Sequence, residues 1–403
     1  MALIVRRGRL PATPHTEFRF DSRFTLEEIH GSFGFSGPYS RKIHLRRYPT
    51  VQAKPPRLGD FDLTPAAPRA KLALQPYHIR SSRIPFFSDA IRGRVPLLHG
   101  PSTVVSVAKP KSSTPKDAFF RNGEKHELYY VQEGRGTLQT EYGSLPLRKG
   151  LYVVIPKGTT YQVFLETRTA FFLVIESSSL IEFPPHYLNH AGQAKLTAPI
   201  VETEIELPRL ASPIDRLGRF AIDVKHDGGR ITRLTLGHHP FDLVGWEGSL
   251  YPFGFHIDNH HGIAREIHTA PPMHQTFQAG APPSSGFSIC SFVPQMEGWH
   301  PKEIPAPYAH YNVDSDECMF FSNVRYGART GIIEEGSITF HPGALPHSPH
   351  GRAAELSTAS RGRKSQRLAV MLDTFFENLS ITQAAYRFRD PRYPLSWHAA
   401  QLG

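Results

Sequence analysis

The sequence predicts an all-β protein, mainly antiparallel, with two related barrel or jelly-roll lobes and an irregular arm at the N-terminus. Three observations support this fold class. Short β-type segments are separated by Gly and Pro turns, and the 32 Gly and 36 Pro residues follow no fixed period. Heptads and solenoid repeats do not occur in the sequence. A loose internal echo of residue spacings indicates that one lobe repeats in the other.

The first predicted unit, residues 1–100, is a basic arm interrupted by prolines. The chain has 46 Lys and Arg against 36 Asp and Glu, and the whole excess lies in this stretch. No recognition helix, zinc finger or aromatic RNA-binding pattern accompanies the charge, so we expect no nucleic-acid partner. A solvated arm that packs on other subunits, or attracts an anionic substrate, explains the charge better.

The second and third predicted units, residues 101–255 and 256–403, are the two β lobes. Alternating or continuous apolar segments predict their strands. In the second unit these are 103–107, 127–132, 136–141, 150–155, 170–176, 219–224 and 229–236, and in the third 288–293, 318–324, 336–340 and 368–372. No apolar run reaches the roughly 20 residues that span a bilayer, and no signal peptide is apparent, so we expect no membrane contact and a cytoplasmic location.

The same order of residues occurs in both predicted lobes. Each copy has a Glu, then a Gly followed six residues later by a Pro, and it ends on a Tyr in the first lobe and a His in the second. These residues are Glu127, Gly150, Pro156 and Tyr161 in the first lobe, and Glu317, Gly336, Pro342 and His347 in the second. Two barrels of the same kind explain the echo.

A candidate metal site lies in the second lobe. His310 and Asn312 are two residues apart and would face the same side of a strand, while Glu317 would begin the next strand and point back. His347 adds a second imidazole from a tight turn. Two imidazoles and one carboxylate leave three octahedral positions open, as in non-haem Fe(II) oxygenases, although such ligands also serve manganese. With only two cysteines, a Cys-rich zinc site and a disulfide framework are excluded.

These spacings resemble the paired motifs of the cupin superfamily, with Asn312 in place of its usual second histidine. Residues 240–246, 307–310 and 341–350 are similar to the homogentisate 1,2-dioxygenase family within that superfamily. The resemblance implies two cupin-type lobes and an Fe(II)-dependent enzyme. Such an enzyme cleaves homogentisate with O₂ to maleylacetoacetate, in tyrosine and phenylalanine catabolism. It also implies a homo-oligomer of trimers paired into hexamers.

The resemblance implies a role for individual residues. The iron ligands fall on His310, Glu317 and His347. A catalytic histidine that exchanges the substrate's phenolic proton falls on His268, and a catalytic, hydroxyl-binding tyrosine falls on Tyr326. A histidine that lines the substrate pocket falls on His341. For the last three residues simpler readings stay open: a turn residue, a packed aromatic and a brace behind the ligands, in that order.

The first lobe resembles the family's metal-free copy. Phe120, Asn122 and Tyr161 stand where ligands would be expected, and only Glu127 is retained. Since a phenylalanine cannot coordinate a metal ion, we expect a structural role for this lobe.

Other functions remain open at this point. The family usually carries an arginine directly after the first iron-binding histidine, and this chain has Tyr311. Another hydroquinone such as gentisate is therefore an alternative substrate, and Arg325 or a residue of the arm could replace the missing arginine. A metal-dependent cupin isomerase or hydrolase, which would consume no O₂, and a non-catalytic binding protein are alternatives of another class.

Overall fold

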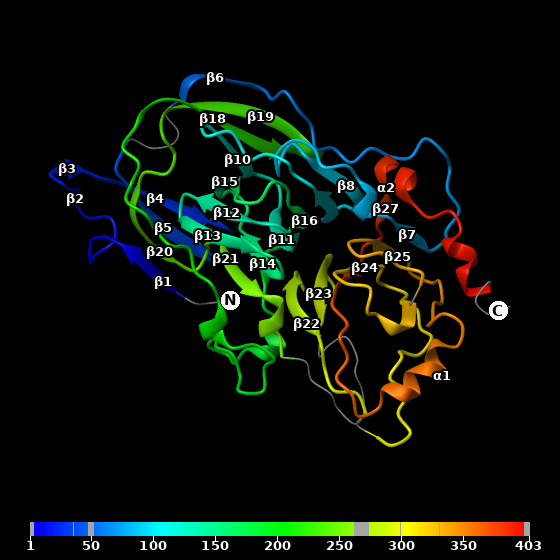
Figure 1. The fold of residues 1–403 in the computed structure, drawn as a ribbon. Coiled ribbons are helices and arrows are strands. Elements are labelled where there is room, and N and C mark those ends of the chain that lie inside the picture. The colour runs from blue at the N-terminus through cyan, green and yellow to red at the C-terminus, as the bar shows by residue number, and fades with distance from the viewer. Residues whose placement is uncertain are drawn as a thin grey trace.

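The computed structural model describes residues 4–34, 36–46, 52–261, 274–298, 300–329 and 331–398. Within these residues the all-β fold predicted from the sequence is confirmed: three seven-stranded sheets, one four-stranded sheet and one two-stranded sheet (Figure 1). Strand pairs in the described sheets are antiparallel except β10 (Ala118–Asn122) with β18 (Leu217–His226), which are parallel. None of the helices in the described part of the chain is long and apolar enough to cross a membrane.

Two of the seven-stranded sheets enclose the core of the first lobe. The outer sheet has the order β13 (Gly143–Arg148), β12 (Arg135–Thr140), β15 (Thr160–Leu165), β10, β18, β19 (Arg230–His238) and β6 (Gln52–Leu58). The middle sheet has the order β21 (Phe253–His256), β14 (Leu151–Ile155), β11 (His126–Glu133), β16 (Phe171–Ser177), β9 (Thr103–Ala108), β8 (Arg94–His99) and β27 (Ser380–Ile381).

The third seven-stranded sheet belongs to the second lobe, and we call it the site sheet. Its order is β17 (Ile181–Glu182), β22 (Gln275–Ala279), β23 (Gly286–Phe292), β26 (Ala369–Phe375), β24 (Glu317–Phe321), β25 (Ile338–His341) and β7 (Tyr77–Ile79). Two short helices flank this lobe in sequence, α1 (Ala353–Ser357) and α2 (Gln383–Phe388). In the described chain the 3₁₀ turns are η1 (Ser81–Arg83), η2 (Pro185–Tyr187), η3 (Glu202–Glu204), η4 (Asp227–Gly229), η5 (Ile257–Asn259), η7 (Gly327–Arg329), η8 (Thr358–Ser360) and η9 (Tyr393–Leu395).

The described part of residues 1–100 is distributed over all five sheets. It supplies three strands of a four-stranded N-terminal sheet, whose order is β1 (Val5–Gly8), β20 (Leu243–Gly248), β5 (Tyr39–His44) and β4 (Leu26–Gly31), and the hairpin of β2 (Arg19–Phe20) with β3 (Arg23–Phe24). It also supplies β6, β8 and β7, one in each seven-stranded sheet. The division of the chain at residues 100 and 255 stays a prediction, as does the oligomeric state.

The middle sheet is buried on both faces. Along β11, Tyr129 and Val131 belong to the core of the first lobe, whereas Leu128 and Tyr130 belong to a core shared with the site sheet. This is the period of two expected for a strand. The same burial explains why β14 reads as a continuous apolar run rather than an alternating one.

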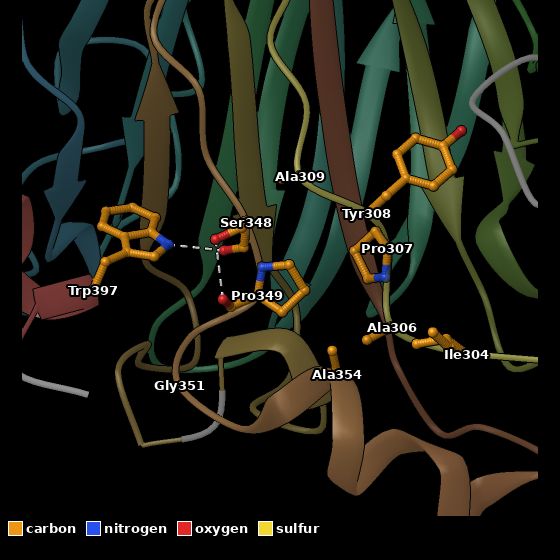
Figure 2. Close-up of a pocket in the computed structure, with 10 residues that line it drawn as sticks. All are labelled: Ile304, Ala306, Pro307, Tyr308, Ala309, Ser348, Pro349, Gly351, Ala354 and Trp397. Atoms are coloured by element: carbon orange, nitrogen blue, oxygen red, sulfur yellow. Dashed lines mark hydrogen bonds between the residues drawn. The ribbon is translucent and has the colours of Figure 1, made fainter. Parts of the chain in front are cut away.

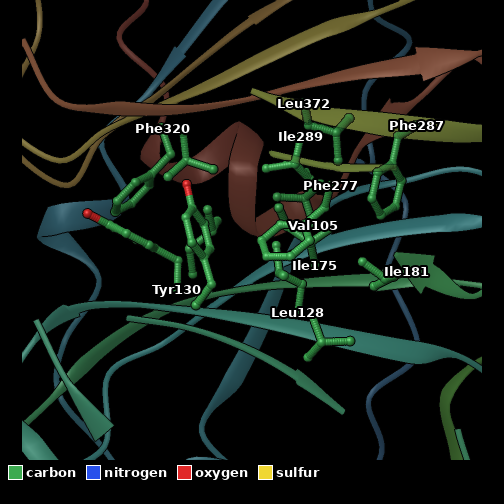
Figure 3. Close-up of a cluster of buried hydrophobic side chains, with 14 of the residues drawn as sticks. Val105, Leu128, Tyr130, Ile175, Ile181, Phe277, Phe287, Ile289, Phe320 and Leu372 are labelled. Carbon is green, nitrogen blue, oxygen red and sulfur yellow. The ribbon is translucent and has the colours of Figure 1, made fainter. Parts of the chain in front are cut away.

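The core shared by the middle sheet and the site sheet joins the two lobes (Figure 3). Tyr130 packs edge-on against Phe320 with ring centroids 6.1 Å apart, and its hydroxyl bonds to Ser322 Oγ at 2.7 Å. Each large side chain buried here contributes roughly 1.5–3 kcal/mol by leaving water. The back of the site sheet is therefore a rigid support for its opposite face.

That opposite face of the site sheet carries the chemistry. Along β24, Cys318 and Phe320 point into the shared core, while Met319 and Phe321 belong to a smaller cluster on the other face. Glu317, at the start of the same strand, lines a cavity of about 300 Å³ together with Met319. The alternation of the strand thus places one carboxylate in that cavity.

Candidate metal centre

Three side chains separated in sequence meet at the site sheet. His310, Glu317 and His347 each offer one ligand atom, and these atoms lie within 4.8 Å of one another. Nε2 of His310 is 3.5 Å from Oε2 of Glu317, and Nε2 of His347 is 3.4 Å from Oε1. Among the described residues this is the one group of His, Cys, Asp and Glu with such geometry.

The backbone brings the two histidines together. His310 and His347 form an isolated antiparallel bridge: the amide of His310 donates to the carbonyl of His347 at 3.0 Å, and the reverse bond is 2.9 Å. Paired residues of such a bridge project their side chains to the same side, and the two rings are 4.3 Å apart. Nδ1 of His310 donates to the carbonyl of Tyr308 at 3.0 Å, which leaves Nε2 free to coordinate.

His341 and Asp316 support the ligand residues without belonging to the triad. His341 Nδ1 donates to Glu317 Oε1 at 2.7 Å, and its Nε2 accepts from the Tyr393 hydroxyl at 3.0 Å. Both ring nitrogens are therefore engaged by the protein, which favours the reading of His341 as a brace. Asp316 accepts from the amides of Gly343 and Leu379 at 2.7 and 2.6 Å, so it ties the turn before His347 to β24.

The electrostatics of the centre follow from burial and these contacts. Burial raises the pKa of Glu317, but the close contacts with the three neighbouring histidines outweigh it and hold the pKa well below its usual range. The bond to Glu317 raises the pKa of His310, whereas burial lowers the pKa of His341 to about 4. Glu317 is therefore an ionised carboxylate, the form in which it coordinates a cation.

The residues present fit a metal ion. Both ring nitrogens of His347 are buried and lack a hydrogen-bond partner among the described residues, although Nε2 faces Glu317. A buried imidazole with no partner is costly unless a ligand satisfies it. Two imidazoles and one carboxylate are hard to borderline donors, suited to Fe(II), manganese or zinc.

Two residues that sequence reasoning missed line the same cavity. Asp373 on β26 has a buried Oδ1 without a hydrogen-bond partner. Burial and the negative charge of Glu317 raise the pKa of Asp373 to about 8. In the sequence, Asp373 could have been noticed as the charged residue between the apolar segment 368–372 and residues 374–376.

Arg329 is the other residue missed. It is only 7% exposed, and its Nη1 donates to the carbonyl of Ser348 at 2.6 Å while the guanidinium lies over the Trp397 ring. No carboxylate of the described chain lies within ion-pair distance of it. A buried cation without a negative partner favours an anionic ligand in the cavity.

The other predicted site residues differ in whether they line the cavity. Tyr326 lines the cavity and is buried against Phe292 and Phe321, with ring centroids 5.9 and 5.5 Å away. Asn312 also lines the cavity, whereas Tyr311 is 53% exposed and does not. His268 lies outside the described residues, so its role stays a prediction.

A second hollow of about 420 Å³ adjoins the metal cavity and shares Pro307, Tyr308, Ser348 and Pro349 with it. Figure 2 shows Trp397 at one side of this hollow, with its indole nitrogen directed at Ser348. That nitrogen donates to the carbonyl of Ser348 at 2.9 Å. Trp397 and Arg329 thus hold the same carbonyl, one residue beyond His347.

In the first lobe, the corresponding glutamate, Glu127, is hydrogen-bonded to other side chains of the protein. Glu127 Oε1 accepts from Asn122 at 3.1 Å and from Arg94, and its Oε2 accepts from the Tyr161 hydroxyl at 2.6 Å. The Arg94 guanidinium also lies 5.0 Å from the centroid of Phe120. An internal cation thus stands among the residues at the expected ligand positions; the metal-free character of the lobe stays a prediction.

Comparisons with known proteins place the chain. Residues 103–257 match the family model described as homogentisate 1,2-dioxygenase N-terminal. A protein of Saccharolobus solfataricus that carries the provisional name of dioxygenase is 30% identical over 400 residues, covering 99% of this chain and 100% of that protein.

Two of the solved structures that are similar to this chain have low sequence identity to it. A cupin 2 conserved barrel domain protein from Leptotrichia buccalis is 10% identical, with 77% of this chain and 100% of that chain covered and a TM-score of 0.33. Ylba from E. coli is 9% identical, with 77% and 94% covered and a TM-score of 0.32. On the full-length match to the Saccharolobus protein and the family model over residues 103–257, this chain belongs to the homogentisate 1,2-dioxygenase family and is an enzyme of the dioxygenase type.

Proposed function

We propose that the protein is an Fe(II)-dependent ring-cleaving dioxygenase that converts homogentisate and O₂ to maleylacetoacetate, a step of tyrosine and phenylalanine catabolism. The observation that carries the proposal is the convergence of His310, Glu317 and His347 on one cavity wall, with the nitrogens of His347 unpartnered. Fe(II) held by these three residues would supply the redox activation that lets O₂ react with an aromatic ring.

The protein's own residues would orient the ring. The cavity of about 300 Å³ admits a single substituted benzene ring and is walled by apolar side chains, including Met319, Met371 and Phe292. Tyr326 is buried and lines this cavity, so its hydroxyl could hold a ring hydroxyl in place. His341 would keep the Glu317 carboxylate in one orientation.

An acidic side chain on the substrate is supported by Arg329. The guanidinium lines the cavity, is buried, and has no carboxylate partner in the described chain. It would neutralise the acetate group of homogentisate in place of the arginine that Tyr311 replaces. Arg325, the replacement considered from the sequence, is exposed and does not line this cavity.

The test is anaerobic loading with Fe(II), followed by oxygen uptake with homogentisate and mass analysis of the product. We expect the loaded protein to hold one iron per chain. The product should be heavier than the substrate by two oxygen atoms. His347→Ala should lose iron and activity, whereas His256→Ala, at the end of β21, should keep both. An iron-loaded protein that takes up no O₂ with any hydroquinone would contradict the proposal.

Gentisate is the second candidate substrate, because Tyr311 stands where the family's arginine is expected and is turned away from the cavity. Its carboxyl group is attached directly to the ring, so it would reach Arg329 differently. The ratio of kcat/KM for homogentisate and gentisate, measured on the same preparation, separates the two. A ratio well below one would replace homogentisate by gentisate as the proposed substrate.

A further inference from the structure

Four polar side chains form a row across the site sheet. His341 on β25 lies opposite Glu317 on β24, Glu317 lies opposite Asp373 on β26, and Asp373 lies opposite Ser288 on β23. Directly opposed residues of antiparallel strands project to the same face, with Cβ atoms about 4.5–5.5 Å apart. Asp373 therefore stands beside the candidate ligand Glu317 and lines the same cavity.

The two carboxyl groups of this row differ in their contacts. Glu317 is contacted by three histidines, whereas Asp373 belongs neither to the ligand group nor to any ion pair of the described chain. Its Oδ1 is buried and accepts no hydrogen bond from the described residues, while the side chain as a whole is partly exposed and lines the cavity. Leaving such an acceptor unsatisfied is unfavourable, so proteins seldom retain one without a ligand.

Among the described residues, no side chain of the cavity wall donates a hydrogen bond to Oδ1 of Asp373. On the same face of the sheet Met371 lies two residues before Asp373 on β26, and Met319 and Phe292 line the cavity from neighbouring strands. Among the described residues this carboxyl group has no donor, and a molecule that fills the cavity it lines can bring one. An aromatic diol brings two hydroxyl donors on a rigid ring, and one bound near Glu317 would bring a hydroxyl within reach of the neighbouring strand.

We propose that Asp373 is a substrate-binding residue whose carboxyl group accepts a hydrogen bond from one ring hydroxyl of the bound hydroquinone. The proposal rests on the proposed function for the identity of the ring, but it concerns binding rather than ring cleavage. The two adjacent carboxyl groups of the row thus have different roles: Glu317 binds the metal ion, and Asp373 binds a hydroxyl group of the substrate.

The experiment is anaerobic calorimetric titration of the Fe(II)-loaded protein with homogentisate and with each of its two monomethyl ethers. Asp373→Leu removes the acceptor and should weaken homogentisate binding about tenfold or more, while Asp373→Asn keeps an acceptor oxygen and should stay within about threefold. Asp373→Ala takes the place of the leucine variant if that variant does not fold. Asp258→Leu, which removes an exposed carboxyl group that does not line the cavity, is the matched control and should bind homogentisate as the wild type does.

The ethers identify the contact. Methylation of the hydroxyl that Asp373 binds should weaken binding to the wild type but cause no further loss in Asp373→Leu. Additive losses for both ethers, or loss of iron from the leucine and alanine variants, would overturn the proposal. A wild type that binds homogentisate but consumes no O₂ would contradict the proposed function and leave the Asp373 contact standing; one that binds no hydroquinone would contradict both.

Discussion

At the residue scale, the candidate centre depends on how one carboxylate distributes its contacts. Oε1 of Glu317 accepts from His341 and lies near His347, while Oε2 faces His310. Because Tyr393 anchors the far side of His341, the carboxylate is held in one orientation before a ligand binds. A residue that bonds to a ligand side chain in this way changes the metal affinity through geometry rather than through charge.

His341→Phe tests this brace, since it keeps the ring volume and removes both nitrogens. We expect the Fe(II) affinity to fall about 10–100-fold because Glu317 loses its orienting donor. Competitive metal titration measures the effect. His350→Phe is the control: His350 is equally buried, but its Nε2 bonds to Ser396 and not to Glu317. Equal losses in the two variants would show that packing alone matters.

Arg329→Gln tests the recognition of an acidic substrate group. Hydrogen bonds to charged groups contribute about 1.5–3 kcal/mol, so we expect the KM for homogentisate to rise about 10–100-fold. The KM for methylhydroquinone, which has no carboxylate, should not change. Arg325→Gln, at the exposed neighbouring position, should leave both values at the wild-type level. A parallel rise for both substrates would assign Arg329 a structural role at Ser348.

At the element scale, buried charges join strands that are distant in sequence. Arg94 at the start of β8 contacts Glu127 on β11, Tyr161 on β15 and Glu176 on β16. All of these side chains are buried. A buried pair of this kind adds little net stability, but removing one partner leaves an uncompensated charge.

Arg94→Met should therefore destabilise the protein by about 3–5 kcal/mol in urea unfolding, because Glu127 and Glu176 lose their shared cation. The matched control is Arg352→Met, which breaks an exposed pair with Glu355 and should change stability by about 0–1 kcal/mol. Similar effects of the two substitutions would contradict the role given to Arg94.

A second buried network links strands of the N-terminal sheet. Burial lowers the pKa of His44 on β5, but hydrogen bonds to Asp242 and Glu28 outweigh it and raise the pKa to about 9. The folded state therefore binds a proton more tightly than the unfolded state, whose histidine pKa is about 6.5. This contribution to stability is complete below about pH 6.5 and is lost as the pH rises through about 9.

His44→Gln should remove that pH dependence. Wild-type stability should fall by about 3 kcal/mol between pH 6.5 and 9, and the variant's profile should be flatter over the same window. The free energy of unfolding in urea, measured at several pH values, gives the comparison. His15→Gln, at an exposed position, should keep the wild-type slope. A wild-type profile that rises over this window would contradict the sign.

At the scale of the whole molecule, the two lobes share one apolar core. The middle sheet and the site sheet pack face to face, and residues such as Leu128, Phe277 and Phe320 contribute to one cluster (Figure 3). The face of the site sheet that holds the candidate ligands is the opposite one. We therefore expect the lobes to unfold together and the metal centre to depend on the shared core.

Phe320→Ala tests this coupling. The cavity it creates should cost about 3–5 kcal/mol and should lower the midpoint of a single calorimetric transition. Phe376→Ala, at a site that is 51% exposed, should change stability by less than about 0.5 kcal/mol. Two transitions, of which only one shifts, would show that the lobes are independent units.

Much of the fold could be predicted because its signals are local. The expected segments 127–132, 150–155 and 170–176 lie on β11, β14 and β16, since apolar runs bounded by turns mark strands without reference to partners. The grouping of His310, Glu317 and His347 was also predictable. The spacing from His310 to Glu317 and the turn residues before His347 are each contained in a short stretch of sequence, so both could be recognised without knowledge of strand pairing.

The sequence by itself determined the strand content and the three candidate ligands, and tertiary structure decided the rest. That the first hundred residues pair with strands from every part of the chain could not be predicted, because strand pairing is non-local and register is set by packing. Asp373 and Arg329 were not predicted for the same reason. Only the pairing of β24 with β26 puts Asp373 beside Glu317, and only burial without a carboxylate partner distinguishes Arg329 from other arginines in the chain.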